Sequence, residues 1–262
     1  GSTRGVKVMA FPELCLTAYT CSDLFLQESL LREAKKELKR ILQASKSKDM
    51  ILFVGMPWMH KGKLYNVAAV LNRGRILGIV PKKHLPNYSE FYELRHFNPG
   101  MEKVEMTDWE GVQVPMGMNL LFACRTMPEL VLAAELCEDV WVPCPPSISH
   151  ALAGATVIAN CSASDETTGK DQYRYNLICG QSARLVCGYI YANAGEGEST
   201  QDLVFGGQNI IAENGTCLVQ SDRFKNACIC ADMDLGRIIS ERRRMTTFKD
   251  EENKASSYET VY

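Results

Sequence analysis

Short apolar runs alternate with longer stretches of helical period along the first half of the chain. Apolar runs that predict strands cover residues 6–11, 50–56, 67–71 and 76–80. From about residue 22 to residue 48, leucines and isoleucines recur at helical spacing, and the opposite face carries basic residues interleaved with glutamates. That mixture is typical of a helix whose outer face is solvated. The turn Asn72-Arg73-Gly74 predicts a hairpin between its flanking strands.

The second half of the chain continues the same alternation. Further strands are predicted at 120–123, 131–136, 157–160, 190–193 and 227–233, helices at 171–186 and 235–245, and a hairpin at 210–220 that turns at Asn214-Gly215. Residues 81–110 have no clear period, and an irregular stretch of that length inside a compact domain indicates a functional loop. Strands placed between helices predict one α/β domain.

The composition changes this picture only by excluding some classes of partner. The chain has 262 residues, of which 46% are hydrophobic and 23% charged, and its formal net charge is -2. A near-neutral balance lacks the long-range attraction that nucleic acids and anionic membranes exert on basic proteins, so we expect neither as a partner. No apolar stretch reaches the roughly 18 residues of a membrane helix, and no signal peptide pattern opens the chain. We therefore expect a soluble, cytoplasmic protein.

The cysteines and histidines provide no recognisable metal site. Eleven cysteines lie mostly inside apolar runs, without a CxxC pair, which predicts that most are buried thiols in a reducing compartment. The four histidines lack metal-ligand spacing, and no phosphate-binding loop of the GxxxxGK[ST] type occurs. We therefore expect no metal and no nucleotide in this chain.

Three reactive side chains each follow an apolar, strand-like run: Glu13, Lys82 and Cys137. Because ligands of open α/β sheets bind beyond the carboxyl ends of strands, the three could meet in one cleft. Glu13 can act as acid and base, Lys82 can stabilise a thiolate and an oxyanion, and Cys137 can act as nucleophile. Taken singly, each has a structural interpretation: Glu13 as a helix-start carboxylate, Lys82 as a surface lysine and Cys137 as an incidental thiol. Together they predict acyl transfer from an amide without metal or cofactor.

These residues lie in motifs that resemble a known superfamily. The segments FPELCLTAY (11–19), PKKHLP (81–86) and ELCEDVW (135–141) resemble, in order, the three motifs of the nitrilase, or carbon–nitrogen hydrolase, superfamily. The resemblance places that superfamily's Glu-Lys-Cys triad on Glu13, Lys82 and Cys137. Residues 87–100 are similar to the segment after the lysine, where an auxiliary glutamate matches Glu93, with Glu90 as the alternative. The implied fold is a four-layer αββα sandwich of the nitrilase type.

Three further segments resemble one branch of the superfamily, the glutaminase domains of glutamine-dependent NAD+ synthetases. They are CEDVWVP (137–143), NCSAS (160–164) and AGEGEST (194–200). The resemblance implies hydrolysis of L-glutamine to glutamate and ammonia. It also implies that the amino-acid end of the substrate is surrounded by Tyr88, Glu138, Ser164 and Lys170. At the last position the branch often has arginine, which can grip a carboxylate with two donors where lysine cannot.

The chain also departs from the pattern it resembles. The superfamily domain usually begins with a strand upstream of the one that ends near Glu13, and here only residues 1–5 precede Val6. We expect that strand to be missing, a sheet edge to be exposed and Glu13 to be loosened. We expect residues 1–248 to form the hydrolase domain and residues 249–262 a tail, or the start of a linker to an absent synthetase domain.

The resemblance also implies the context of the reaction. ATP and magnesium are expected only in the absent synthetase domain, which would receive the ammonia, and a homo-oligomer is implied. Two other functions stay open: a stand-alone amidase of the same superfamily that acts on another small amide, and a catalytically silent fragment that serves as an assembly module.

Overall fold

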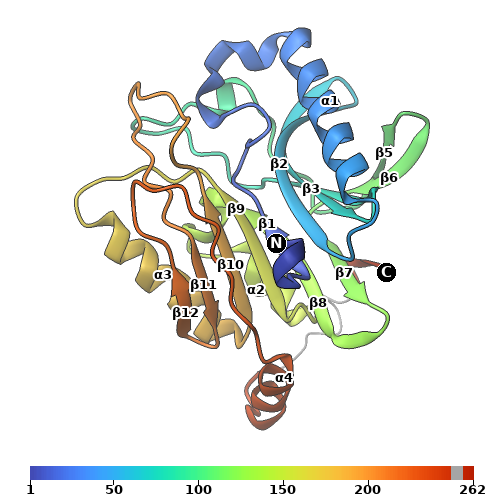
Figure 1. The fold of residues 1–262 in the computed structure, drawn as a ribbon, viewed down its shortest axis with the longest axis vertical. Coiled ribbons are helices and arrows are strands. Elements are labelled where there is room, and N and C mark those ends of the chain that lie inside the picture. The colour runs from blue at the N-terminus through green and yellow to red at the C-terminus, as the bar shows by residue number, and fades with distance from the viewer. Residues whose placement is uncertain (249–255) are drawn as a thin grey trace.

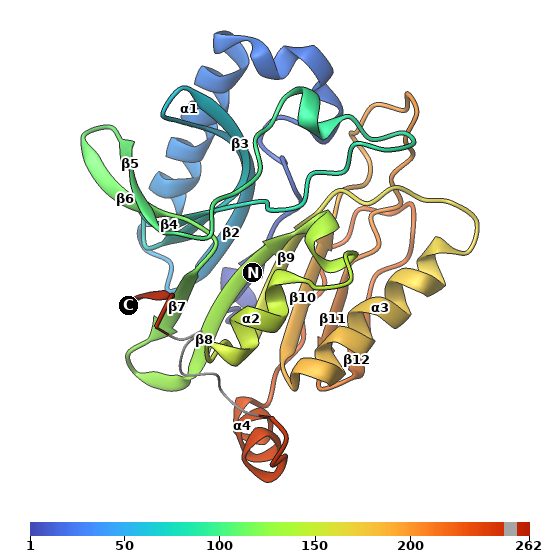
Figure 2. The ribbon, with the colours of Figure 1, turned by 180° about the vertical axis from the view of Figure 1, so that it is seen from behind.

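The computed structural model describes residues 1–248 and 256–262, which form two sheets packed face to face with helices outside them (Figures 1 and 2). The six-stranded sheet has the order β1-β2-β3-β4-β6-β5. Its strands are β1 (Val8–Ala10), β2 (Ile51–His60), β3 (Lys63–Asn72), β4 (Arg75–Pro81), β5 (Glu105–Trp109) and β6 (Val112–Met116). The seven-stranded sheet has the order β12-β11-β10-β9-β8-β7-β13. Its strands are β7 (Leu120–Cys124), β8 (Met127–Leu136), β9 (Val157–Ser162), β10 (Gly188–Asn193), β11 (Ile210–Glu213), β12 (Thr216–Gln220) and β13 (Glu259–Val261).

Helices cover the outer faces of both sheets. Helix α1 (Glu28–Ser45) lies on the six-stranded sheet, and α2 (Pro146–Leu152) and α3 (Lys170–Leu185) lie on the seven-stranded sheet, as Figure 2 shows. Helix α4 (Leu235–Arg244) lies at the end of the molecule, at the bottom of Figure 1. Four short 3-10 segments complete the elements: η1 (Ser2–Arg4), η2 (Tyr19–Leu26), η3 (Glu93–Arg95) and η4 (Cys137–Val140).

Alternating side chains explain why the strand sequences are apolar throughout. In β2, Leu52 and Val54 pack under α1, whereas Phe53 between them packs in the centre of the sandwich. In β9, Ile158 faces the helices and Val157 faces the other sheet. Strands buried on both faces read as continuous hydrophobic runs. The resulting layers, α1, two sheets, then α2 with α3, confirm the four-layer αββα sandwich.

Most of the predicted elements are confirmed, but the first helix is shorter than predicted. The hairpin β3–β4 turns through Arg73 and Gly74, both with positive φ, as a tight hairpin requires. The helix predicted over 22–48 covers only Glu28–Ser45, because the residues before it form the 3-10 segment η2 and Gln27 between the two is extended, with φ -94° and ψ 125°. Strands β5, β6 and β13 and helix α2 were not predicted, since each carries too short or too mixed a pattern.

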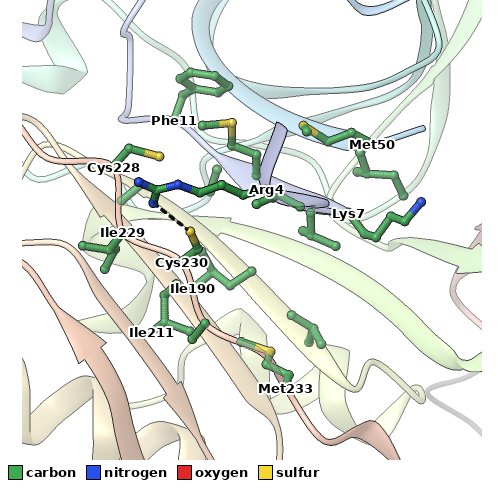
Figure 3. A pocket seen from close by; sticks show the side chains of 18 of the residues that line it. Arg4, Lys7, Phe11, Met50, Ile190, Ile211, Cys228, Ile229, Cys230 and Met233 are labelled. Carbon is green, nitrogen blue, oxygen red and sulfur yellow. Dashed lines mark hydrogen bonds between the residues drawn. The ribbon is translucent and has the colours of Figure 1, made fainter. Parts of the chain in front are cut away.

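The strand predicted over 227–233 is wrong. This segment forms no strand, although it runs extended along a cavity of about 1550 Å³ between the N-terminal residues and β10. Figure 3 shows Arg4 reaching across this cavity, where its Nη1 donates to Cys230 Sγ at 3.3 Å. A strand needs a partner for its backbone hydrogen bonds, and β1 pairs only with β2. The apolar run is therefore present without a partner strand.

The described C-terminal residues return to the edge of the seven-stranded sheet. Strand β13 pairs in parallel with β7, and the Tyr258 hydroxyl lies 2.8 Å from His150 Nδ1. Residues 249–255, where the predicted tail begins, lie outside the described residues, so the domain boundary at residue 248 stays a prediction. In the described part of the chain, no helix is long and apolar enough to cross a membrane.

The cysteines are free thiols, as predicted, but fewer of them are buried than predicted. Only Cys137, Cys161, Cys179 and Cys187 are buried, whereas Cys144 and Cys228 are exposed. Within residues 1–248 and 256–262, no group of three His, Cys, Asp or Glu side chains could hold a metal ion.

Candidate active site

A buried lysine lies between two buried carboxylates at the end of β4. Lys82 follows the last residue of that strand and is 0% exposed. Its Nζ lies 2.7 Å from Glu13 Oε1 and 2.6 Å from Glu93 Oε1. Burial alone would lower the pKa of Lys82, but the two carboxylates raise it well above its ordinary value. The lysine therefore stays charged, and its donors point at both acids.

Both sheets hold Glu13. Its Oε1 accepts from Asn66 Nδ2 on β3 at 2.6 Å, and its Oε2 accepts from the backbone N–H of Ala163, just after β9, at 2.9 Å. A Cβ on Gly55 would lie 2.3 Å from the carbonyl oxygen of Pro12, so only glycine lets this loop lie against β2. The expected loosening of Glu13 is wrong, because the residue is 0% exposed and both its oxygens are bound.

Glu93 lies at the start of η3, inside the irregular stretch that was predicted to be a functional loop. Its Oε1 accepts from Lys82 and from the Tyr19 hydroxyl at 2.8 Å. Burial raises the pKa of Glu93 to about 7, Lys82 opposes the shift and Glu13 adds to it. Of the two candidate glutamates, Glu93 contacts the lysine, which favours it over Glu90.

Cys137 begins η4 directly after β8, and its φ is 38°, a left-handed conformation that is uncommon for a residue with a side chain. Its N–H donates to Asn160 Oδ1 at 3.0 Å. Burial raises the pKa of the Cys137 thiol well above its ordinary value, the Glu13 carboxylate raises it further, and the Lys82 ammonium lowers it. The thiol is thus protonated at rest and lies within electrostatic reach of both residues.

Of the four residues predicted to bind the amino-acid end of a substrate, Tyr88 and Lys170 lie next to the Phe91 ring. The Tyr88 hydroxyl donates to Glu138 Oε1 at 2.8 Å, and the Tyr88 ring centroid lies 5.8 Å from that of Phe91. The Lys170 ammonium lies 5.9 Å from the Phe91 ring centroid and contacts Asp165. Ser164 is buried, and its N–H donates to Asn193 Oδ1 at 2.7 Å. The structure thus brings Tyr88 and Glu138 into direct contact and places Tyr88 and Lys170 next to the same aromatic ring.

Several residues of the site escaped the sequence analysis. Arg174 is 0% exposed, and its Nη1 donates to Glu166 Oε1 at 2.6 Å while its Nη2 donates to the carbonyl oxygen of Asp165 at 2.8 Å. It lies one helical turn after Lys170, a spacing that could have revealed it. Asn66 and Asn160 are polar residues inside apolar strands, which is the signal that could have identified them. Tyr19 had no such signal.

Comparison with known proteins places the chain in a family. The sequence profile described as carbon-nitrogen hydrolase matches residues 2–243. A glutamine-dependent NAD(+) synthetase of Mycobacterium tuberculosis (strain ATCC 25618 / H37Rv) is 45% identical over 248 residues, which are 94% of this chain and 36% of that protein. A protein of the same name from Aquifex aeolicus is 32% identical over 239 residues, covering 91% of this chain and 38% of its own length. The chain therefore spans little more than a third of these relatives.

Solved structures agree with the fold. The crystal structure of a glutamine-dependent NAD(+) synthetase from Cytophaga hutchinsonii matches with a TM-score of 0.75 and 29% identity, covering 84% of this chain and 35% of that one. A carbon-nitrogen hydrolase from Helicobacter pylori G27 matches with a TM-score of 0.71 over 94% of this chain and 84% of its own. At 20% identity, the second likeness shows a shared fold only.

Proposed function

The chain belongs to the carbon–nitrogen hydrolase family, and we propose that within it the chain hydrolyses the side-chain amide of L-glutamine to glutamate and ammonia. The observation that carries this proposal is the buried Lys82, charged and placed between Glu13 and Glu93 beside the Cys137 thiol. The similarity to glutamine-dependent NAD(+) synthetases supports the choice of substrate.

In the first half of the reaction, Cys137 acts as the nucleophile. Because burial keeps its thiol protonated, attack requires a base, and Glu13 takes the proton as the sulfur bonds to the carboxamide carbon. The carbonyl oxygen becomes an oxyanion, which Lys82 and the backbone N–H of Glu138 stabilise. Glu13 then returns the proton to the leaving nitrogen, the carbon–nitrogen bond breaks, and ammonia leaves a thioester on Cys137.

In the second half, water replaces ammonia. Glu13 takes a proton from the water, whose oxygen attacks the thioester carbon. The carbon–sulfur bond breaks, glutamate leaves, and the proton returns to the sulfur. Glu93 keeps Lys82 oriented through both halves, since it contacts the same ammonium as Glu13 does.

The four residues predicted to surround the amino-acid end of the substrate have the chemistry to bind a free amino acid. Glu138 provides a carboxylate for the substrate ammonium group, held in place by Tyr88. Lys170 provides a cation for the substrate carboxylate, and Ser164 lies in the segment that leads to it. A carboxylate and an ammonium group that lie close enough to interact electrostatically would discriminate against simple amides that lack both charges.

The wider context is part of the proposal. We propose that residues 1–248 are a glutaminase domain whose ammonia passes to a synthetase domain, where ATP and magnesium would be used, and that the protein is a homo-oligomer in the cytoplasm. The relatives' names and the chain's coverage of about a third of their length support this arrangement.

Ammonia release from L-glutamine tests the proposal. We expect hydrolysis by the wild-type chain and none by Cys137→Ala, and an unchanged rate in that variant would overturn the assignment of the nucleophile. Faster hydrolysis of simple aliphatic amides would favour a stand-alone amidase. If glutamine is not hydrolysed, and an electrophilic glutamine analogue fails to label Cys137 in the folded protein, the chain is a catalytically silent module.

A further inference from the structure

The backbone turn that presents Cys137 is strained and is held by two side-chain acceptors. A left-handed backbone at a residue with a Cβ costs free energy, so it persists only where its surroundings determine it. Here the N–H of Leu136 donates to Asp139 Oδ2 at 3.1 Å, and the N–H of Cys137 donates to Asn160 Oδ1 at 3.0 Å. Asp139 belongs to the same turn, whereas Asn160 lies on the neighbouring strand, β9. Asn160 therefore ties the turn to the sheet.

Asn160 is itself held by a chain of buried groups behind the nucleophile. Its Nδ2 donates to the Tyr189 hydroxyl on β10 at 3.1 Å, and that hydroxyl donates to Glu135 Oε1 on β8. Glu135 Oε2 accepts from the N–H of Ser147 in α2 at 2.8 Å. The exposed fractions of Asn160, Tyr189 and Glu135 are 0%, 0% and 1%, so water does not compete for these bonds.

The direction of these bonds is fixed by chemistry. The backbone N–H of Cys137 can only donate, so Asn160 Oδ1 accepts from it and Asn160 Nδ2 donates to the Tyr189 hydroxyl, whose own hydrogen is then left for Glu135 Oε1. The amide group is thereby fixed with its oxygen toward Cys137. Each bond in such a chain polarises the next, which strengthens the last acceptor.

Anchoring of α2 explains only part of this arrangement. The bond from Ser147 N–H gives Glu135 a structural role at the first turn of that helix, where backbone donors lack helical partners. Tyr189 and Asn160 are not needed for that anchor. They extend from the carboxylate across two strands to end on the N–H of the nucleophile.

We propose that Asn160, backed by Tyr189 and Glu135, is a positioning residue that holds the strained turn at Cys137 and so aims the thiol at Lys82 and Glu13. The proposal rests on the proposed role of Cys137. Asn160 touches no reacting atom and acts through the Cys137 backbone. Its loss lets the turn relax, which removes the thiol from the lysine that stabilises its thiolate.

The experiment compares Asn160→Ala and Tyr189→Phe with Thr107→Val. The control removes a buried hydrogen bond in the other sheet, in which Trp58 Nε1 donates to the Thr107 hydroxyl at 3.0 Å. The first readout is kcat and KM for ammonia release from glutamine. The second is the rate of alkylation by iodoacetamide, resolved by mass spectrometry: Cys137 is compared with exposed Cys228, and buried Cys161 reports unfolding.

We expect Asn160→Ala to lower kcat by about 10²-fold, because a small displacement of reacting groups has an effect of that size, and to leave KM nearly unchanged. In the same variant, the ratio of Cys137 to Cys228 alkylation should fall by about tenfold. Both decreases should be smaller in Tyr189→Phe, because that variant keeps the Asn160 amide oxygen that accepts from Cys137. A kcat and a labelling ratio that match those of Thr107→Val would overturn the proposal, as would faster labelling of Cys137.

Two outcomes need separate interpretation. If Asn160→Ala exposes Cys161 to alkylation, the variant has unfolded, and Tyr189→Phe decides by the same criteria, because it keeps the aromatic ring. If the wild-type chain releases no ammonia from glutamine, the proposed function fails, and the labelling ratio alone decides whether Asn160 positions the thiol.

Discussion

Replacing Lys82 by methionine is the most direct test of the buried acid–lysine–acid cluster. Methionine fills a similar volume but leaves Glu13 and Glu93 next to each other, without the cation that lies 2.7 Å and 2.6 Å from them. Removing one partner of a buried ion pair typically destabilises a protein by about 3–5 kcal/mol, because the remaining charge is uncompensated. We expect a loss of that size at pH 8, together with loss of activity.

The loss should depend on pH in a definite direction. Burial already raises the pKa of Glu93 to about 7 with Lys82 present. Without the lysine, the folded-state pKa of Glu93 rises further above the unfolded value, because nothing then opposes the effect of its burial. The folded state then binds more protons than the unfolded state, so stability falls as pH rises through this window and is recovered in acid. Lys82→Met should therefore be closest to the wild type near pH 5.

Denaturant unfolding at pH 5 and pH 8 measures both effects. Lys36→Met is the matched control, since the exposed Lys36 lies 2.7 Å from Glu33 and surface pairs contribute at most about 1 kcal/mol. The double variant Lys82→Met with Glu93→Gln should recover part of the loss at pH 8, because one buried charge has gone. A loss below about 1 kcal/mol in Lys82→Met, equal at both pH values, would refute the cluster as described.

Three further predictions concern groups around the site. Burial lowers the pKa of His150 to about 4, so the unfolded state binds a proton that the folded state does not, and the free energy of unfolding falls as pH falls from about 6.5 toward 4. His150→Leu should therefore reduce the loss of unfolding free energy between pH 7 and pH 5 by about 2 kcal/mol in denaturant unfolding. A loss equal to that of the wild type would contradict this. Arg174→Lys should raise KM for glutamine by about tenfold with less effect on kcat, since lysine cannot bind Glu166 and the Asp165 carbonyl from a rigid fork. Equal KM values in the variant and the wild type would exclude a role of Arg174 in glutamine binding. Gly55→Ala should displace the Glu13 loop and destabilise the protein by about 1–3 kcal/mol in thermal unfolding. Gly180→Ala, where a Cβ has no neighbour within 4 Å, should be neutral or stabilising. Equal effects of the two substitutions would show that the Glu13 loop can move to accommodate the added methyl group.

The site could be predicted to the extent that it depends on where strands end. Lys82 and Cys137 directly follow β4 and β8, and Glu13 comes just after β1, so their positions indicated that the three could meet, and the resemblance to the superfamily motifs then singled them out. Asn160 stands out as a polar residue in a strand that is buried throughout, but the sequence does not show which groups it contacts. Contacts between strands decide which buried polar groups meet, and a single sequence does not record them.

The failed prediction over 227–233 has a different cause. Its apolar run satisfies the local requirement for a strand, but a strand also needs backbone partners from elsewhere in the fold. Likewise, the helical period before Glu28 continues through residues that form the 3-10 segment η2, which the extended Gln27 separates from α1. In both cases tertiary context overrides the local pattern.

The way Glu13 is held also has a consequence for how the protein folds. Its carboxylate bonds to Asn66, Lys82 and Ala163, which lie 53, 69 and 150 residues away along the chain and come from both sheets. A chain that has formed only one sheet therefore has no complete cluster, however regular that sheet is. Contacts of such long sequence separation form slowly, because large loops must close first. During refolding, hydrolytic activity should appear with the docking of the two sheets and lag behind secondary structure, so it would report the last step of assembly.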